Sequence, residues 1–240
     1  MDAGSGEPLV ALHGIPTSSA LFEPLVPLLK GYRLIAPDLL GQGDTDVPGT
    51  GPLGYAAYAG HLQAFLSAVP PPAFHLLVHD LGGVLGLEWA CDHPGRVRSI
   101  VILSTTISRS FRVGVLAYAA NLLLGARLIH WAVGATLKGG NRLDVRVVES
   151  WARPWSRQRV LRGLDHFSPA HLKDLRSKLR SLRVPALLIW GEQDNIFGRA
   201  HALEIVKELP GSSLVTIQNC GHWSPVDAPE EVARLINTRF

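Results

Sequence analysis

Residues 76–83 read LLVHDLGG and join an unbroken apolar run to a glycine-rich helical pattern. An apolar run without polar alternation is typical of a strand buried on both faces. Strand, sharp turn and helix in this order form a nucleophile elbow, which exposes its apical residue at the carboxyl end of the sheet. Here the apex is Asp80. Because Asp also favours the N-cap of a helix, the rest of the chain must decide between a nucleophile and a helix cap.

Short apolar runs alternate with helical patterns on both sides of this segment. Strands are predicted over 8–12, 32–36, 73–79, 97–103, 186–190 and 213–218, and helices over 20–29, 55–69, 82–92, 199–209 and 229–238. This alternation predicts an α/β fold, in which a mostly parallel sheet carries helices on both faces. Functional sites of such sheets lie outside the carboxyl ends of the strands.

The alternation stops between residues 108 and 182, where helical patterns cover 113–137, 143–152 and 170–182. We therefore predict a core formed by 1–107 and 183–240, with an inserted helical cap over 108–182. A bilayer-spanning helix needs about 20 apolar residues, and 113–137 is long enough. Because Arg127 and His130 interrupt that stretch, we expect a buried or lid-forming helix and no membrane contact.

The net charge of +3 is unevenly distributed along the chain. The predicted cap holds 14 basic and 4 acidic residues, whereas the rest holds 9 basic and 16 acidic residues. A basic block can mark an anionic partner. These charges are dispersed through apolar helices without a nucleic-acid-binding motif, so we expect a solvated helical surface and no nucleic-acid partner.

The composition excludes several other classes. The chain does not open with a charged region followed by an apolar one, so we expect no signal peptide and a cytoplasmic location. Cys91 and Cys220 are too few for a disulfide framework. Neither a metal-ligand spacing nor a phosphate-binding glycine loop is present. We expect no metal and no cofactor, and a small-molecule substrate.

Three polar residues follow three different predicted strands, in the chain order Asp80, Asp194, His222. Nucleophile, acid and histidine occur in this order in Ser-type triads on α/β sheets. We predict that these three residues are catalytic. Glu192 is an alternative acid, but it lies closer to its strand and is expected to point to a helix or to solvent. The strand ending at Leu103 is followed by no carboxylate.

Five motifs together resemble the alpha/beta hydrolase superfamily, and within it the branch of haloalkane dehalogenases and epoxide hydrolases. They are HGIPTS at 13–18, APDL at 36–39 with Gly41 and Gly43 beyond it, HDLGG at 79–83, GEQD at 191–194, and Gly221-His222. The resemblance covers both core segments and fades in the cap. It implies the alpha/beta-hydrolase fold and a hydrolase with an Asp nucleophile.

A carboxylate nucleophile is suited to displacing a leaving group from a saturated carbon, which forms an alkyl ester on the enzyme. We expect Asp80 to attack a carbon that bears a halide or an epoxide oxygen. His222, oriented by Asp194, would then deprotonate the water that hydrolyses this ester. The backbone N–H groups of Ile15 and Leu81 are expected to form the oxyanion hole.

The chain departs from this branch at the leaving-group side of the site. Haloalkane dehalogenases hold the halide with a Trp after the nucleophile and with an Asn in the His-Gly-X position or a second Trp from the cap. Leu81 and Ile15 occupy the first two places, and aliphatic side chains donate no hydrogen bond. A cap Trp would have to supply the donor, and the cap contains Trp131, Trp151 and Trp155.

Epoxide hydrolases use two cap tyrosines, and this cap offers Tyr118 alone. We therefore predict a substrate pocket that includes Tyr118, Trp151 and Trp155. Three functions stay open at this point. The first is an Asp-nucleophile hydrolase, dehalogenase-like or epoxide hydrolase-like. The others are an esterase that activates water directly and a catalytically silent relative that binds a small molecule.

Overall fold

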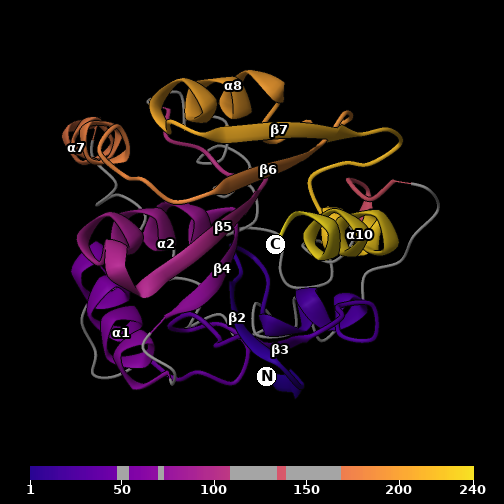
Figure 1. Ribbon diagram of the computed structural model, residues 1–240, viewed down its shortest axis with the longest axis horizontal. Coiled ribbons are helices and arrows are strands. Elements are labelled where there is room, and N and C mark those ends of the chain that lie inside the picture. The colour runs from indigo at the N-terminus through magenta and orange to yellow at the C-terminus, as the bar shows by residue number, and fades with distance from the viewer. Residues whose placement is uncertain (48–53, 70–72, 109–133, 139–168) are drawn as a thin grey trace, which may run out of the picture.

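The computed structural model describes residues 1–47, 54–69, 73–108, 134–138 and 169–240. Seven strands form one sheet in the order β1-β3-β2-β4-β5-β6-β7 (Figure 1). The strands are β1 (Asp2–Gly4), β2 (Glu7–Leu12), β3 (Tyr32–Ile35), β4 (Phe74–His79), β5 (Val97–Leu103), β6 (Ala186–Gly191) and β7 (Ser212–Ile217). Only β1 runs antiparallel to its neighbour among these strands. The predicted mostly parallel sheet is confirmed.

Helices cover both faces of the sheet, with α1 and α2 on one side and α10 on the other (Figure 1). The helices are α1 (Tyr55–Ala68), α2 (Leu81–Asp92), α7 (Pro169–Leu179), α8 (Arg199–Glu208), α9 (Ser224–Asp227) and α10 (Pro229–Arg239), with 3-10 helices η1 (Ser19–Leu25) and η2 (Pro94–Arg96). Strands β4 and β6 are buried at every position. This burial explains why they read as continuous apolar runs and not as alternating patterns.

The carboxyl ends of the central strands lie level with one another. Leu12 of β2 pairs with Val78 of β4, and His79 pairs with Leu103 of β5. The chain passes from β2 to β3 on one side and from β4 to β5 on the other. The direction of the chain connections thus reverses between β2 and β4, and ligands of such sheets bind at the carboxyl ends of the strands that flank this point.

One predicted element differs from the structure, and some short elements were not predicted. The helix expected over 20–29 is a shorter 3-10 helix, η1, that contains Pro24. Proline donates no backbone hydrogen bond and disrupts an α-helix interior, and Pro27 follows soon after. Strand β1 and helix α9 were not predicted, because three and four residues are too few to show a period.

Helix α7 lies within the segment predicted to be the cap. It packs against α2 and α8, and Leu172, Leu175 and Leu179 belong to the same buried cluster as the sheet. Residues 109–133 and 139–168, which include Tyr118, Trp151 and Trp155, lie outside the described residues. The cap and these pocket residues stay predictions. Within the described ranges, no helix combines the length and apolar composition that crossing a bilayer requires.

Candidate active site

Asp80 stands at the sharp turn between β4 and α2. Its backbone has φ 51° and ψ −121°, a left-handed conformation that costs a non-glycine residue roughly 1–3 kcal/mol. Two hydrogen bonds hold the turn: Asp80 N–H donates to Ser104 O over 3.2 Å, and Thr105 Oγ1 donates to Asp80 O over 2.6 Å. The side chain does not accept the N-cap hydrogen bond that the second or third N–H of α2 would donate. The elbow interpretation therefore fits Asp80 better than the helix-cap interpretation.

Glycines let the neighbouring loops approach this turn. A Cβ on Gly14 would overlap the Asp80 carboxyl group, and one on Gly82 would overlap the Leu12 and His13 carbonyl oxygens. The loop after β2 and the start of α2 thus meet at a separation that any larger residue would prevent.

The two oxygens of the Asp80 carboxylate have different surroundings. Ile15 N–H donates to Oδ1 over 2.8 Å, and Leu81 N–H also bonds the carboxylate. Oδ2 lies 3.7 Å from Nε2 of His222. Burial raises the pKa of Asp80, although His222 and these two N–H groups act in the opposite direction. Both predicted oxyanion-hole N–H groups therefore bond the Asp80 carboxylate, with Ile15 on Oδ1, and Oδ2 faces the histidine.

Asp194 orients His222. Its Oδ2 lies 3.2 Å from Nδ1 of His222, and its Oδ1 accepts the N–H groups of Ile196 and Phe197, each over 2.9 Å. Because a carboxylate only accepts hydrogen bonds, Nδ1 of His222 must donate and Nε2 points to Asp80. Glu192, the alternative acid, is exposed to solvent. The structure brings together the three residues that the chain order suggested.

His222 and Asp194 shift each other's pKa in opposite directions. Burial alone would lower the pKa of His222, but the charges of Asp194 and Asp80 outweigh it and raise that pKa. Burial alone would raise the pKa of Asp194, but His222 and the backbone donors outweigh it and lower that pKa. The pair favours an imidazolium beside a carboxylate, the state that a histidine reaches after accepting a proton.

We expect Asp194→Asn to reduce kcat roughly 10²- to 10⁴-fold, because an amide can no longer fix the tautomer of His222. The acid limb of the pH profile should also move to lower pH. His222 acts as a base only when neutral, and without Asp194 its raised pKa falls. The kcat measured against pH for both proteins tests this, and an unmoved limb would contradict the assignment.

His79, which precedes Asp80, supports the backbone of His222. Its Nε2 lies 3.1 Å from His222 O and its ring centroid lies 4.7 Å from that of His222. Burial lowers the pKa of His79 well below its usual range, so Nε2 carries the proton and donates. Nδ1 has no hydrogen-bond partner within the described residues.

Residues 134–138 dock onto the loop that carries His222. Trp223 Nε1 donates to Thr136 Oγ1 over 2.6 Å. The Asp227 carboxylate accepts Lys138 N–H over 2.9 Å and Gly221 N–H over 2.8 Å. Residues 134–138, which belong to the predicted cap, are therefore hydrogen-bonded to residues close to His222 in the chain.

Asp227→Asn should destabilise the protein by about 1.5–3 kcal/mol, the usual cost of losing a hydrogen bond to a charged group. An amide would turn its NH₂ group toward one of the two N–H donors. Denaturant unfolding measures the effect. Asp174→Asn, in which the carboxylate is 62% exposed, is the matched control and should change stability little. Equal stability of both variants would show that the 134–138 contact contributes nothing.

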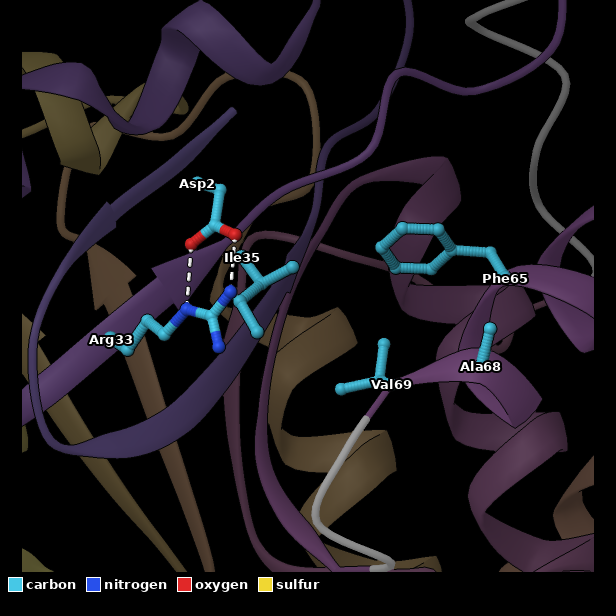
Figure 2. A pocket seen from close by; sticks show the side chains of 6 residues that line it. All are labelled: Asp2, Arg33, Ile35, Phe65, Ala68 and Val69. Atoms are coloured by element: carbon cyan, nitrogen blue, oxygen red, sulfur yellow. Dashed lines mark hydrogen bonds and ion pairs between the residues drawn. The ribbon is translucent and has the colours of Figure 1, made fainter.

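A hollow of about 170 Å³ lies away from these residues, beside β1 and β3. Figure 2 shows its lining by Asp2, Arg33, Ile35, Phe65, Ala68 and Val69. Arg33 and Asp2 form a two-pronged ion pair there, with distances of 2.8 and 2.5 Å. The described ranges contain no cluster of His, Cys, Asp or Glu that could hold a metal ion.

Sequence reasoning missed several residues around the triad. His79 and Asp227 bond the backbone of the His222 loop, and Gln42 lies buried against the Gly14 and Thr17 carbonyl oxygens. His79 was adjacent to the predicted nucleophile, and a buried polar residue at a strand end is a usable signal. Gln42 lies in a loop and Asp227 ends the four-residue helix α9, and neither segment is long enough to show a period that marks burial.

Comparison with known proteins extends these findings. The chain matches the alpha/beta hydrolase family over residues 9–235. It is 28% identical to the cis-3-alkyl-4-alkyloxetan-2-one decarboxylase of Shewanella oneidensis, over 97% of this chain and 81% of that protein. It is 41% identical to the haloalkane dehalogenase of Sphingobium indicum, over 43% of this chain and 36% of that protein. The structure of an alpha/beta hydrolase fold protein from Burkholderia ambifaria has a TM-score of 0.83 at 22% identity, covering 100% of this chain and 93% of that one.

Proposed function

Because the chain belongs to the alpha/beta hydrolase family, we propose that it works with Asp80 as nucleophile, His222 as base and Asp194 as the acid that orients the base. One observation carries this proposal. Oδ1 of Asp80 accepts the Ile15 N–H over 2.8 Å, whereas Oδ2 faces His222 Nε2 across 3.7 Å. The carboxylate is thus held in one orientation, with one oxygen available for attack.

In the first step, Oδ2 attacks a saturated carbon of the substrate. The bond from that carbon to the leaving group breaks, and its electron pair departs with the leaving group. An alkyl ester on Asp80 results. Oδ1 becomes the carbonyl oxygen of this ester and stays in contact with the Ile15 N–H.

In the second step, His222 takes a proton from a water molecule that attacks the Asp80 carbonyl carbon. The negative charge develops on Oδ1, which already accepts the Ile15 N–H, and the Leu81 N–H that bonds the same carboxylate is the second donor. As the intermediate collapses, the leaving oxygen takes the proton from His222 to form an alcohol, and Asp80 returns to its carboxylate form by losing the other water proton to solvent. Asp194 stabilises the imidazolium that exists between these events.

We propose a small apolar substrate, with haloalkanes as the first candidates. The 41% identity to a haloalkane dehalogenase supports this class. Residues 108–182 are proposed to cover the site as a cap, with Tyr118, Trp151 and Trp155 facing the substrate. The docking of 134–138 beside His222 supports that arrangement. A cap Trp would supply the donor for the halide that Ile15 and Leu81 lack.

A second candidate is a four-membered lactone, because the oxetan-2-one decarboxylase matches nearly the whole chain. Asp80 would attack the saturated ring carbon bonded to the ring oxygen, and that C–O bond would break to leave a carboxylate on the same molecule. Loss of CO₂ would then form a C=C bond as the Asp80 carboxylate leaves. A carboxylate leaving group is stabilised by resonance and requires no halide donors, which fits the aliphatic Ile15 and Leu81.

A substrate panel tests the proposal. Purified protein is incubated with a bromoalkane, an epoxide and a 3,4-dialkyl oxetan-2-one, while halide, diol, and alkene with CO₂ are measured. We expect turnover of at least one compound. A folded protein that binds these compounds without converting any would contradict the proposal and support a silent binding protein.

A further inference from the structure

The peptide unit between Gly14 and Ile15 connects the site to a second group of hydrogen bonds. Its N–H, from Ile15, donates to Asp80 Oδ1. In a trans peptide the C=O and N–H point in opposite directions. Whatever fixes the direction of the Gly14 carbonyl therefore fixes the direction of the Ile15 N–H.

Three donor groups, from two residues of its own loop, bond the Gly14 carbonyl. Thr17 donates through Oγ1 over 2.9 Å and through its backbone N–H over 3.2 Å. His13 Nδ1 lies 2.8 Å from the same oxygen. Burial lowers the pKa of His13 to about 4, and its Nε2 accepts Leu39 N–H over 3.0 Å, so Nδ1 carries the proton and donates.

A fourth donor comes from a different segment. Gln42 lies in the loop after β3, and its side chain is fully buried. With its amide nitrogen toward the β2 loop, Gln42 donates to Gly14 O and to Thr17 O, each over 3.0 Å. Two backbone bonds hold Gln42 itself, from Gln42 N to Leu39 O over 2.9 Å and from Thr45 N to Gln42 O over 3.0 Å. Gln42 therefore anchors the β2 loop to the loop after β3.

We propose that Gln42 is a positioning residue for the oxyanion hole: its amide holds the Gly14 carbonyl so that the Ile15 N–H stays on Asp80. A carbonyl that accepts hydrogen bonds also polarises its own peptide unit, which strengthens the N–H as a donor. This inference rests on the proposed function, because it assigns the Ile15 N–H to the stabilisation of a charge on Oδ1.

The test compares wild type with Gln42→Met, which keeps the length of the side chain and removes both donors. Amide hydrogen exchange of Ile15 and the carboxyl titration of Asp80 are followed by NMR. We expect faster exchange and a higher pKa of Asp80, since its ionised form loses a donor. His222 and Asp194, the charged groups that face Asp80 among the described residues, are unchanged. Gln218→Met, at an exposed position, should alter neither readout.

Catalysis provides an independent readout. Hydrolysis of the ester should slow about tenfold in Gln42→Met with KM unchanged, since one neutral hydrogen bond is worth roughly that factor. In Gln42→Glu, which has nearly the same size, the protonated side chain keeps one O–H donor. The rate of ester hydrolysis in Gln42→Glu should therefore be closer to that of wild type at low pH than at high pH. If Gln42→Met fails to fold, Gln42→Glu is measured in its place.

Unchanged Ile15 exchange and unchanged Asp80 titration in a folded Gln42→Met or ionised Gln42→Glu protein would overturn the inference, whatever its activity. Both NMR readouts require no substrate. If they change as expected but no compound of the panel is converted, Gln42 still positions Ile15 and the proposed function is what fails.

Discussion

Asp80→Asn is expected to abolish turnover, with a loss of roughly 10⁴-fold or more, the size seen when a covalent nucleophile is removed. An amide oxygen is a poor nucleophile, so the first step fails. The substitution nearly preserves the shape of the side chain, and Oδ1 of the amide can still accept the Ile15 N–H that bonds Asp80. The loss should therefore appear in kcat while the fold is retained.

Steady-state turnover of the compound identified by the panel measures this effect, with circular dichroism as the check on folding. Asp174→Asn removes a carboxylate from an exposed position and should retain full activity. An Asp80→Asn protein that also retained full turnover would exclude Asp80 as nucleophile and leave His222 as a direct activator of water.

His222→Phe should stop the reaction after the first step. Asp80 can still attack, because its carboxylate does not need a base to be nucleophilic. The ester then persists, since loss of a general base slows its hydrolysis roughly 10²- to 10⁴-fold. We expect a burst of one equivalent of leaving group per protein and a mass increase that maps to the Asp80 peptide.

The size of this adduct identifies the substrate. A bromoalkane leaves only its alkyl group, whereas an opened epoxide retains its oxygen. A decarboxylated lactone leaves no lasting adduct and continues to turn over without His222, because that route consumes no water. A folded His222→Phe protein that shows neither an adduct nor turnover with any probe would contradict covalent catalysis.

The elbow and the three candidate residues could be predicted because each carries a local signal. Asp80, Asp194 and His222 each lie within a few residues after an apolar run. Strand order and parallel direction then bring these ends to one edge of the sheet. Their proximity follows from the fold, whereas their catalytic role is tested only by the variants above.

Other features depend on contacts that a sequence does not display. Gln42 reads as a loop residue between two glycines, yet it is fully buried against the Gly14 carbonyl. Asp227 reads as a solvent-facing acid near a helix start, yet it joins Gly221 to Lys138. Helix η1 is the opposite case, in which a local signal was outweighed by another. Its apolar pattern favoured an α-helix, but Pro24 disrupts an α-helix and the segment forms a 3-10 helix.

A single turnover in H₂¹⁸O, with protein in excess over the compound that the panel identifies, tests the central claim most directly. If water attacks the carbonyl carbon of an Asp80 ester, the alcohol keeps an ordinary oxygen from Asp80. The ¹⁸O then appears in the Asp80 carboxylate, where peptide mass spectrometry detects it. An alcohol that carries ¹⁸O, together with an unlabelled Asp80, would show that water attacks the substrate itself and would contradict the covalent mechanism.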